Sequence, residues 1–242
     1  GRVPAGAAES VQTSGVTGPA GDQEWLHPPA DAVRRAVGAA LEEDLTPLGD
    51  LTSSLLAPVD GEARLVAREA GRLAGARCAT ETWAQVDPQE ELAWAVDEGA
   101  VLRPGQVMAV VRGPFRSILT GERTALNFLG HLSGIATLTA SYVAAAAEGG
   151  SARVWDTRKT VPGLRSLAKA AVRAGGGRNH RGNLSDWLLV KDNHLGGIGI
   201  PEAVGPAPDR WPGGPDREGG PGGRCPPARS ARACWGRGGC RR

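Results

Sequence analysis

The spacing of apolar residues along the chain predicts two amphipathic helices. Apolar residues recur every four positions after Asp31, which predicts a helix through Leu41 with Asp31 as its N-cap. A longer apolar stripe predicts a second helix from Thr120 to Ala147, with Thr120 as its N-cap. Two glycines follow this stripe, and glycine is a common residue at a helix end.

Between the two helices, shorter apolar runs alternate with Gly and Pro. The runs 63–67 and 106–111 predict strands, and residues 80–86 predict a short helix between them. This part of the chain is typical of a small α+β domain.

After the long helix the pattern becomes strand, helix and strand. We predict a strand over 153–156, a helix over 164–174, a glycine loop over 175–177 and a strand over 187–191. This order favours a parallel α/β arrangement.

Composition limits the classes of partner. The 28 basic and 26 acidic residues nearly balance, so the bulk charge predicts no nucleic-acid and no membrane partner. We find no apolar run long enough to span a membrane and no signal peptide. Cys78 is the single cysteine before residue 201, which favours a reducing, cytoplasmic location.

Both ends of the chain differ from its middle. Residues 1–22 are rich in Gly, Ala, Ser and Thr, and we expect them to be disordered. Residues 201–242 hold 10 Gly, 8 Pro and 8 Arg, with no periodic pattern. This tail is interpreted either as an altered reading frame or as an ordinary disordered tail. Its net charge of +4 would give only weak, salt-sensitive binding to a polyanion.

Cationic side chains follow the predicted strands of the second half. Arg158 and Lys159 come directly after the first strand, His180 and Arg181 follow the glycine loop, and Lys191 ends the second strand. Cations at the carboxyl ends of barrel strands usually serve a ligand. If the strands are neighbours, the five groups face one pocket suited to an anion with several charges. The alternatives are a solvated strand end and a structural histidine.

Six motifs occur in register along the chain. They are Glu43-Asp44-Leu45 with Gly49-Asp50-Leu51-Thr52, Leu119-Thr120-Gly121-Glu122-Arg123-Thr124-Ala125-Leu126-Asn127, Leu132-Ser133-Gly134-Ile135-Ala136-Thr137, Asp156-Thr157-Arg158-Lys159-Thr160, Asn179-His180-Arg181, and Lys191-Asp192-Asn193-His194. In order and spacing they resemble the quinolinate phosphoribosyltransferase family, also called nicotinate-nucleotide pyrophosphorylase (carboxylating). A molybdenum-uptake-associated paralogue with much of the same pattern is the alternative.

The resemblance implies an α/β protein with an N-terminal α+β sandwich domain followed by an incomplete α/β barrel. On this basis we divide the chain into a disordered segment (1–22), a sandwich domain (23–116), the first part of the barrel with the quinolinate site (117–200) and an aberrant tail (201–242).

The resemblance also implies an activity. The family transfers phosphoribose from phosphoribosyl pyrophosphate, accompanied by magnesium, to the ring nitrogen of quinolinate. The 2-carboxylate then leaves as carbon dioxide, which gives nicotinate mononucleotide and pyrophosphate for NAD biosynthesis. By resemblance Lys159 and Lys191 are catalytic, and a homodimer is expected in which Arg123 reaches the partner's site. The implied substrate-binding set is Arg123, Arg158, Lys159, His180, Arg181 and Lys191.

One part of the family pattern is missing after Ile200. The acidic residues for ribose and metal, and the glycine-rich loops for the 5′-phosphate, have no match there. Glu202, Asp209, Asp216 and Glu218 follow no predicted strand and receive no role. We therefore expect a chain truncated or frame-shifted after about residue 200, with weak activity or none. A catalytically dead homologue is the second functional hypothesis.

Overall fold

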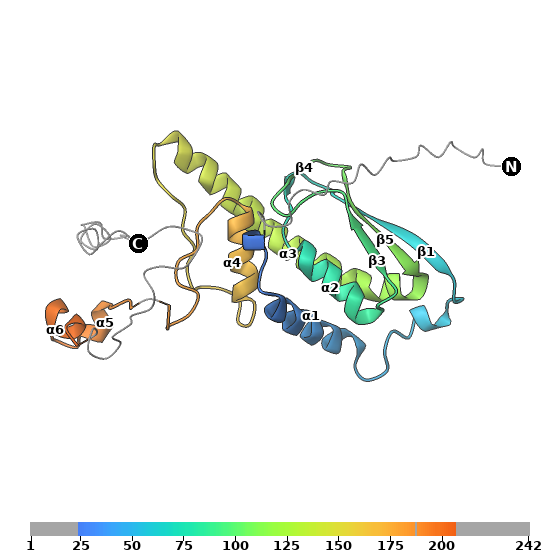
Figure 1. Cartoon of the computed structure of the whole chain (residues 1–242), viewed down its shortest axis with the longest axis horizontal. Coiled ribbons are helices and arrows are strands. Elements are labelled where there is room, and N and C mark those ends of the chain that lie inside the picture. The colour runs from blue at the N-terminus through green and yellow to red at the C-terminus, as the bar shows by residue number, and fades with distance from the viewer. Residues whose placement is uncertain (1–23, 187, 207–242) are drawn as a thin grey trace.

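The computed structural model describes residues 24–206 of the 242, apart from Trp187. Figure 1 shows a mixed α/β molecule with the long helix α3 running through it and two short helices, α5 and α6, at one end. In chain order the elements are η1 (Glu24–Leu26), α1 (Ala30–Leu45), η2 (Ser53–Leu55), β1 (Asp60–Val66), β2 (Gly71–Arg72), α2 (Ala76–Val86), β3 (Glu91–Trp94), β4 (Val101–Leu102), β5 (Val107–Pro114), α3 (Phe115–Glu148), α4 (Arg165–Ala174), α5 (Asp192–Leu195) and α6 (Ile200–Val204).

The N-terminal half is built on a three-stranded antiparallel sheet with β5 between β1 and β3. Val111 at its centre is opposite Ala63 on β1 and Leu92 on β3. Side chains alternate between the two faces of a strand, so Val111 and Ala109 point to one face and are fully buried. The neighbouring Arg112 is exposed on the other face. Strands β2 and β4 form a separate antiparallel pair.

Trp83 fixes the packing of α2 against α3. Its side chain is buried, and its indole N–H donates a hydrogen bond to the Ile118 carbonyl oxygen at 3.1 Å. A Cβ atom at Gly121 would lie 2.7 Å from the Trp83 ring, so glycine permits this close approach. A buried indole with its N–H satisfied contributes a large apolar area without an unpaired donor.

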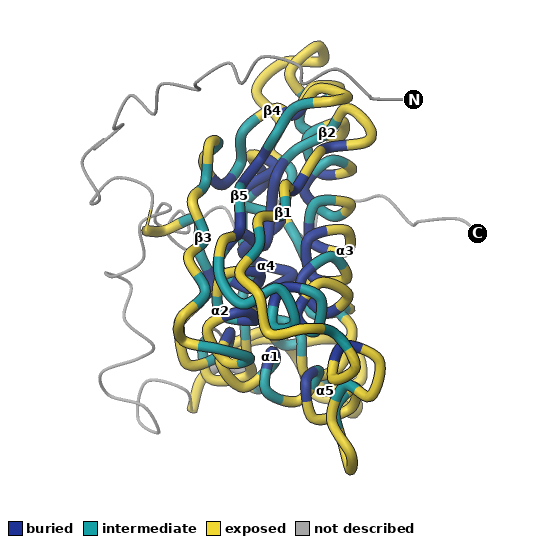
Figure 2. Tube along the Cα trace, turned by 90° about the vertical axis from the view of Figure 1, so that its right-hand side faces the viewer, coloured by how far each residue is buried: buried dark blue, intermediate teal, exposed yellow. Residues whose placement is uncertain are grey.

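A second apolar cluster joins the four helices α1, α2, α3 and α4, and Figure 2 colours the buried positions of the chain dark blue. Its buried members are Val33, Val37, Leu41, Ala74, Cys78, Phe128, Leu132, Ala136, Leu167, Ala171 and Ala174. The cluster packs α4 onto the same helix α3 that covers the sheet.

Polar contacts also hold α3 against the segment around β2. The Ser133 hydroxyl accepts a hydrogen bond from the Ala74 N–H at 3.0 Å and approaches the Ala74 carbonyl at 3.1 Å. Thr137 accepts a hydrogen bond from the Arg72 N–H at 2.9 Å. Both side chains lie in the motif 132–137, whose hydroxyls therefore satisfy backbone groups of the neighbouring segment.

Both predicted N-caps are wrong. Helix α1 begins before Asp31, which lies in its first turn and pairs with Arg35 at 2.8 Å. Helix α3 begins at Phe115, and Thr120 lies within it. The Thr120 hydroxyl donates a hydrogen bond to the Asp50 carboxylate at 2.9 Å, so it serves a tertiary contact rather than a helix end.

The predicted strands of the second half are the main departure. The segment 153–156 forms a single parallel bridge, between Trp155 and Arg178, and none of the strands in the described residues pairs with it. Residues 188–190 adopt no strand in the structure, and Trp187 lies outside the described residues. The predicted helix 164–174 is confirmed as α4, and Gly175 follows its last residue.

Two proposed domain boundaries fall inside helices. The boundary after residue 116 lies in the first turn of α3, and the boundary after residue 200 lies in α6. The proposed segment 1–22 lies outside the described residues, as does the tail 201–242 beyond residue 206.

Within the described part of the chain, α3 is the one helix that is long and apolar enough, by length and composition, to cross a membrane. The expectation that the chain holds no such run was therefore wrong. In this structure the buried stripe of α3 packs against the sheet and the other helices.

Candidate active site

One parallel bridge brings the two cationic loops together. The Asp156 N–H donates to the Arg178 carbonyl at 2.9 Å, and the Arg178 N–H donates to the Val154 carbonyl at 2.8 Å. Since the two segments run in the same direction, both loops leave the bridge at the same end. The residues that follow the bridge are Arg158 and Lys159 in one loop and His180 and Arg181 in the other.

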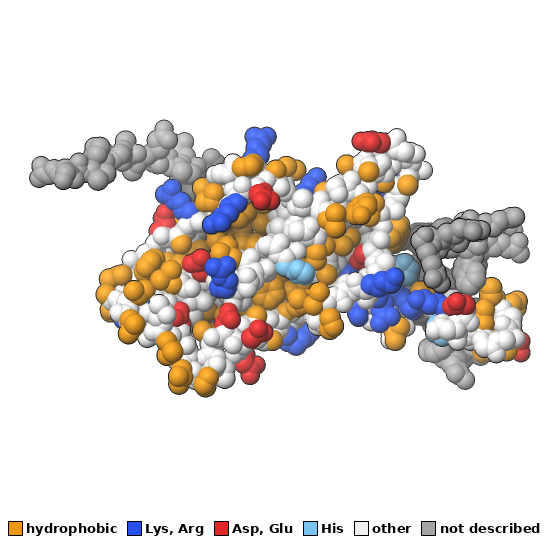
Figure 3. Space-filling model, turned by 180° about the vertical axis from the view of Figure 1, so that it is seen from behind, with side chains coloured by type: hydrophobic (Ala, Val, Ile, Leu, Met, Phe, Trp, Pro, Cys, Tyr) orange, Lys and Arg blue, Asp and Glu red, His pale blue; other side chains and the backbone are white. Residues whose placement is uncertain are grey.

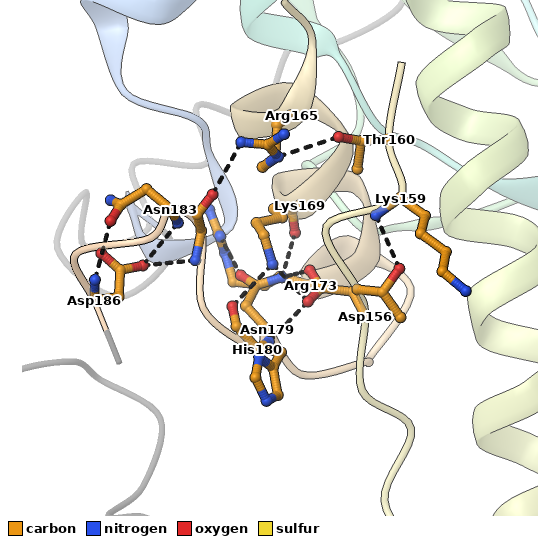
Figure 4. A network of polar contacts seen from close by, with 12 residues as sticks. Asp156, Lys159, Thr160, Arg165, Lys169, Arg173, Asn179, His180, Asn183 and Asp186 are labelled. Carbon is orange, nitrogen blue, oxygen red and sulfur yellow. Dashed lines mark hydrogen bonds and ion pairs between the residues drawn. The ribbon is translucent and has the colours of Figure 1, made fainter. Parts of the chain in front are cut away.

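Asp156 lies at the centre of a buried polar network (Figure 4). One carboxylate oxygen accepts hydrogen bonds from Lys169 Nζ at 2.6 Å and from the His180 N–H at 2.7 Å. The other accepts from Asn179 Nδ2 at 2.7 Å. The Asp156 and Lys169 side chains are only 7% and 8% exposed, so the ion pair is buried with several of its polar atoms satisfied.

The network fixes the backbone of His180 on both sides. Its N–H binds Asp156, and its carbonyl oxygen accepts a hydrogen bond from Lys169 Nζ at 2.8 Å. In Figure 4 the imidazole projects away from the Asp156 carboxylate. Burial, and after it the positive charges of Lys169 and Arg181, lower the pKa of His180. The ring is therefore neutral at neutral pH and can both donate and accept a hydrogen bond.

Asn179 connects this network to the N-terminal segment. Its Nδ2 also donates to the Lys169 carbonyl at 2.9 Å, and its Oδ1 accepts from Arg173 Nη1 at 2.5 Å. Arg173 in turn donates to the backbone carbonyls of Trp25 at 2.5 Å and His27 at 2.9 Å. A single guanidinium thus links α4, the residues before α1 and the loop that holds His180.

Arg158 is half-buried after the bridge. Its Nε is shielded from solvent and has no hydrogen-bond partner among the residues that the structure describes. A buried guanidinium nitrogen without an acceptor is unusual in a folded protein, and such a group is a strong hydrogen-bond donor for an anion. Lys159 is exposed, and Figure 4 shows its side chain pointing away from the Asp156 network, toward α3.

Arg181 lies on the wall of a groove of about 310 Å³. The groove is lined by Arg181, Leu184, Leu188, Leu189, Val190, His194, Ile198 and Ala203. Figure 3 shows Lys and Arg side chains gathered between the body of the molecule and the α5–α6 end. The loop that carries Arg181 therefore faces the segment that follows residue 187.

Lys191 lies at the start of a helix and not at the end of a strand as predicted. It is the exposed residue before α5, and its N–H donates to His194 Nδ1 at 3.1 Å. The prediction needed a strand beside the Trp155–Arg178 bridge to bring Lys191 next to Arg158. No residue from 188 to 206 pairs with that bridge. The structure therefore places Arg158 and His180 in adjacent loops but gives Lys191 no ladder contact with them.

Arg123 is exposed on α3, and no hydrogen bond or ion pair joins it to the cationic loops within the described chain. The same face of the helix exposes Gly130, Gly134, Leu138 and Tyr142. Leu138 and Tyr142 are 59% and 60% exposed, so this face is partly apolar.

Sequence reasoning missed Lys169 and Arg173. A lysine in a predicted helix is usually expected to be exposed to solvent. The hydrogen-bond partners of Lys169 and Arg173 also lie in other segments of the chain, which the local sequence does not indicate. One signal was present: Lys169 interrupts the alanine-rich run 168–171, and Ala168, Ala170 and Ala171 are all buried. A charge within an apolar helix face predicts a buried partner of opposite charge.

Asp44 and Asp50 both accept hydrogen bonds from threonine side chains of α3. Asp44 accepts a hydrogen bond from Thr124 at 2.9 Å, and Asp50 accepts from Ser53 and Thr120. No group of three or more His, Cys, Asp or Glu side chains able to hold a metal ion occurs among the described residues.

The fold and the loops define a mixed α/β protein with a group of cationic side chains beside a parallel bridge. The family models for the N-terminal and C-terminal domains of quinolinate phosphoribosyl transferase match residues 50–133 and 135–211. Together they cover more than half of the 242 residues, and the chain belongs to the quinolinate phosphoribosyltransferase family.

Named relatives agree with this assignment. The chain is 43% identical over 175 residues to the nicotinate-nucleotide pyrophosphorylase [carboxylating] of Mycobacterium leprae, covering 70% of this chain and 61% of that one. It is 40% identical over 175 residues to quinolinate phosphoribosyltransferase [decarboxylating] 1b of Nicotiana tabacum, covering 72% of this chain and 49% of the relative. The chain thus spans about half the length of the tobacco protein.

A solved structure gives the same result for the fold. The nicotinate-nucleotide pyrophosphorylase of Francisella tularensis matches with a TM-score of 0.73 and 38% identity, covering 77% of this chain and 66% of that one. The predicted α/β fold, with a sheet domain followed by part of an α/β barrel, is confirmed.

Proposed function

We propose that this chain binds quinolinate and takes part in its phosphoribosylation and decarboxylation, as the names of its relatives describe. The observation that carries the proposal is the shielded, unpartnered Nε of Arg158, held in a loop directly beside the loop of His180 and Arg181. Family membership supplies the identity of the anion, and the two loops supply the charge to bind it.

Quinolinate has two adjacent carboxylates on a pyridine ring. An arginine can bind a carboxylate through two parallel hydrogen bonds, and Arg158 and Arg181 come from separate loops, so each can take one carboxylate. The neutral imidazole of His180 adds a donor or an acceptor. Lys159 and Lys191 add compact positive charges. Such a clamp would fix the direction in which the ring nitrogen points.

The reaction needs this orientation. When phosphoribosyl pyrophosphate loses pyrophosphate, positive charge develops on the ribose and the ring nitrogen attacks it. Fixed cations stabilise the departing pyrophosphate. The ring nitrogen then carries a positive charge, which stabilises the electrons left on carbon 2 as the carboxylate departs as carbon dioxide. No covalent intermediate with the protein is needed.

We propose that magnesium enters with phosphoribosyl pyrophosphate as part of that substrate. The described residues offer no cluster of three metal-binding side chains, so we assign no protein ligand to the ion. We also propose a cytoplasmic location, although two relatives from Nicotiana tabacum are named as mitochondrial.

A homodimer in which Arg123 reaches the partner's site completes the proposal. Its support is the exposed, partly apolar face of α3 that carries Arg123 together with Leu138 and Tyr142. A helix face with apolar groups at 59% and 60% exposure is a candidate contact surface for a second copy.

A second candidate function is quinolinate binding without turnover. The chain spans about half of the tobacco relative, and of the acidic residues considered after Ile200 only Glu202 is described, where it lies exposed in α6. The molybdenum-uptake-associated alternative has no better support from the comparisons.

Calorimetry with quinolinate tests the proposal. We expect wild type to bind, Arg158→Ala to lose at least roughly tenfold in affinity, and Arg64→Ala to bind like wild type. Arg64 is a matched control, since it is an exposed arginine of β1 whose hydrogen bond is to Glu62. Adding phosphoribosyl pyrophosphate with magnesium then separates the two candidates, because release of carbon dioxide identifies a complete enzyme. A folded wild-type chain that does not bind quinolinate would refute both.

A further inference from the structure

Arg173 occupies a position between two parts of the molecule that are far apart in sequence. From α4 its guanidinium reaches the carbonyl oxygens of Trp25 and His27 and the side-chain oxygen of Asn179. It therefore donates to three acceptors at once. A planar guanidinium with five N–H groups can meet this demand, and an ammonium group cannot meet it with the same geometry.

The contact with Asn179 decides how that amide is oriented. With Oδ1 held by Arg173, Nδ2 must point toward Asp156 and the Lys169 carbonyl, which it reaches at 2.7 Å and 2.9 Å. A rotated amide would place Nδ2 against the guanidinium and Oδ1 against the Asp156 carboxylate. Arg173 therefore selects one of the two orientations of the Asn179 side chain.

This orientation is passed on to the cationic loop. Asn179 directly precedes His180, whose N–H binds the same Asp156 carboxylate at 2.7 Å. The Asp156 carboxylate thus receives hydrogen bonds from two consecutive residues, which fixes the chain direction just before Arg181. Arg173 reaches this loop through its hydrogen bond to Asn179, and it reaches the segment before α1 through the carbonyls of Trp25 and His27.

We propose that Arg173 is a positioning residue for the quinolinate site. Through Asn179 it sets the direction of His180 and Arg181, and it couples this loop to the anchored segment 24–28. The inference rests on the proposed binding of quinolinate. It also implies reciprocity: quinolinate binding tightens the anchoring of residues 24–28, because two linked equilibria affect each other equally.

Arg77 provides the matched control. It anchors the same segment from α2, through two contacts with the Glu24 carboxylate at 2.9 Å and 2.5 Å and one with the Pro28 carbonyl at 3.3 Å. No hydrogen bond links Arg77 to Asn179 within the described chain. Arg77→Met therefore loosens the segment alone, whereas Arg173→Met loosens the segment and the loop.

The test measures quinolinate affinity and amide hydrogen exchange in wild type, Arg77→Met, Arg173→Met, Asn179→Ala and the double variant Arg173→Met/Asn179→Ala, all as the full chain. We expect Arg173→Met to weaken quinolinate binding roughly tenfold and to speed exchange over 178–181. Arg77→Met should speed exchange only over 24–28 and leave affinity within about twofold. The double variant should lose no more affinity than Asn179→Ala alone, because both changes break one path.

Equal losses of affinity in Arg77→Met and Arg173→Met would overturn the inference, since Arg173 would then act only as a tether of the segment. Additive losses in the double variant would also overturn it. If wild type does not bind quinolinate, the proposed function fails, and the exchange over 178–181 still decides whether Arg173 orders the loop. If Arg173→Met does not fold, Arg173→Lys serves instead, because it keeps the charge and most of the stem but not the three-way contact.

Discussion

The N-terminal half and the cationic loops are each stabilised by a different kind of interaction. Leu73, Trp83 and Val111 in the first region are at most 2% exposed and pack among other apolar side chains. In the second region the corresponding central groups are the ions Asp156 and Lys169. Figure 2 shows buried positions along the helices and strands of the N-terminal half, while much of the chain after α4 is exposed.

The two regions therefore differ in how well they tolerate a substitution. Apolar contacts are non-directional, so a core can adjust to a small change in shape at modest cost. A buried polar network depends on each of its hydrogen bonds, and losing one member leaves another charge or donor unpaired. The network thus fixes the orientation of His180 and its neighbours, but this orientation depends on a few hydrogen bonds.

The largest predicted effect is at the centre of the network. Asp156→Ala leaves the Lys169 ammonium buried without its partner, and we expect a loss of about 3–5 kcal/mol of stability. Urea unfolding monitored by hydrogen exchange over 154–182 measures it. Asp31→Ala removes an exposed carboxylate paired with Arg35, and as a control it should change stability by less than about 1 kcal/mol. Similar small losses in both variants would show that the network is not what holds the loops.

The apolar counterpart is Leu73→Ala. Leu73 is fully buried between the strands and α2, and its truncation should cost about 3 kcal/mol through lost contacts and a residual cavity. The same unfolding experiment measures the loss. Leu73→Met keeps most of the volume and should cost under about 1.5 kcal/mol. If the methionine variant is as unstable as the alanine variant, the apolar core does not adjust to a small change in side-chain shape.

The smallest predicted effect depends on pH. Both carboxylate oxygens of Glu90 are shielded from solvent without a hydrogen-bond partner in the described structure. Burial, with smaller effects of Asp87 and Asp60, raises the pKa of Glu90 to about 7. The folded state thus favours the protonated form, and the destabilisation is absent at low pH and complete once pH exceeds about 7.

Glu90→Gln should therefore stabilise the protein at pH 8, by about 1–2 kcal/mol after allowance for solvent screening, and change nothing at pH 4. Melting temperatures of both proteins at the two pH values test this. An equal shift at both pH values would mean that the carboxylate charge is not the cause.

The sequence predicted the elements that depend on local pattern. The helix predicted over 164–174 matches α4, and the strands predicted over 63–67 and 106–111 overlap β1 and β5. The adjacency of the Arg158 and His180 loops was also predicted, although the pairing behind it is one bridge, between Trp155 and Arg178.

What the sequence did not predict depends on contacts between remote residues. Thr120 resembles an N-cap in its own segment, and only the Asp50 contact shows its use. Lys169 and Arg173 act on Asp156 and on residues before α1, which no local pattern connects. The strand predicted over 187–191 needed a neighbouring strand, and none pairs with its described residues.

The 34 residues of α3 make a rod about 50 Å long. The two family domains meet at residue 134, which is the middle of this rod and not a linker. Its first half covers the sheet and its second half packs against α4, so neither half of the chain can turn without bending a continuous helix. In this chain the two family domains are thus separate in sequence but joined by one continuous helix, and dividing the chain at residue 134 would break the element that both require.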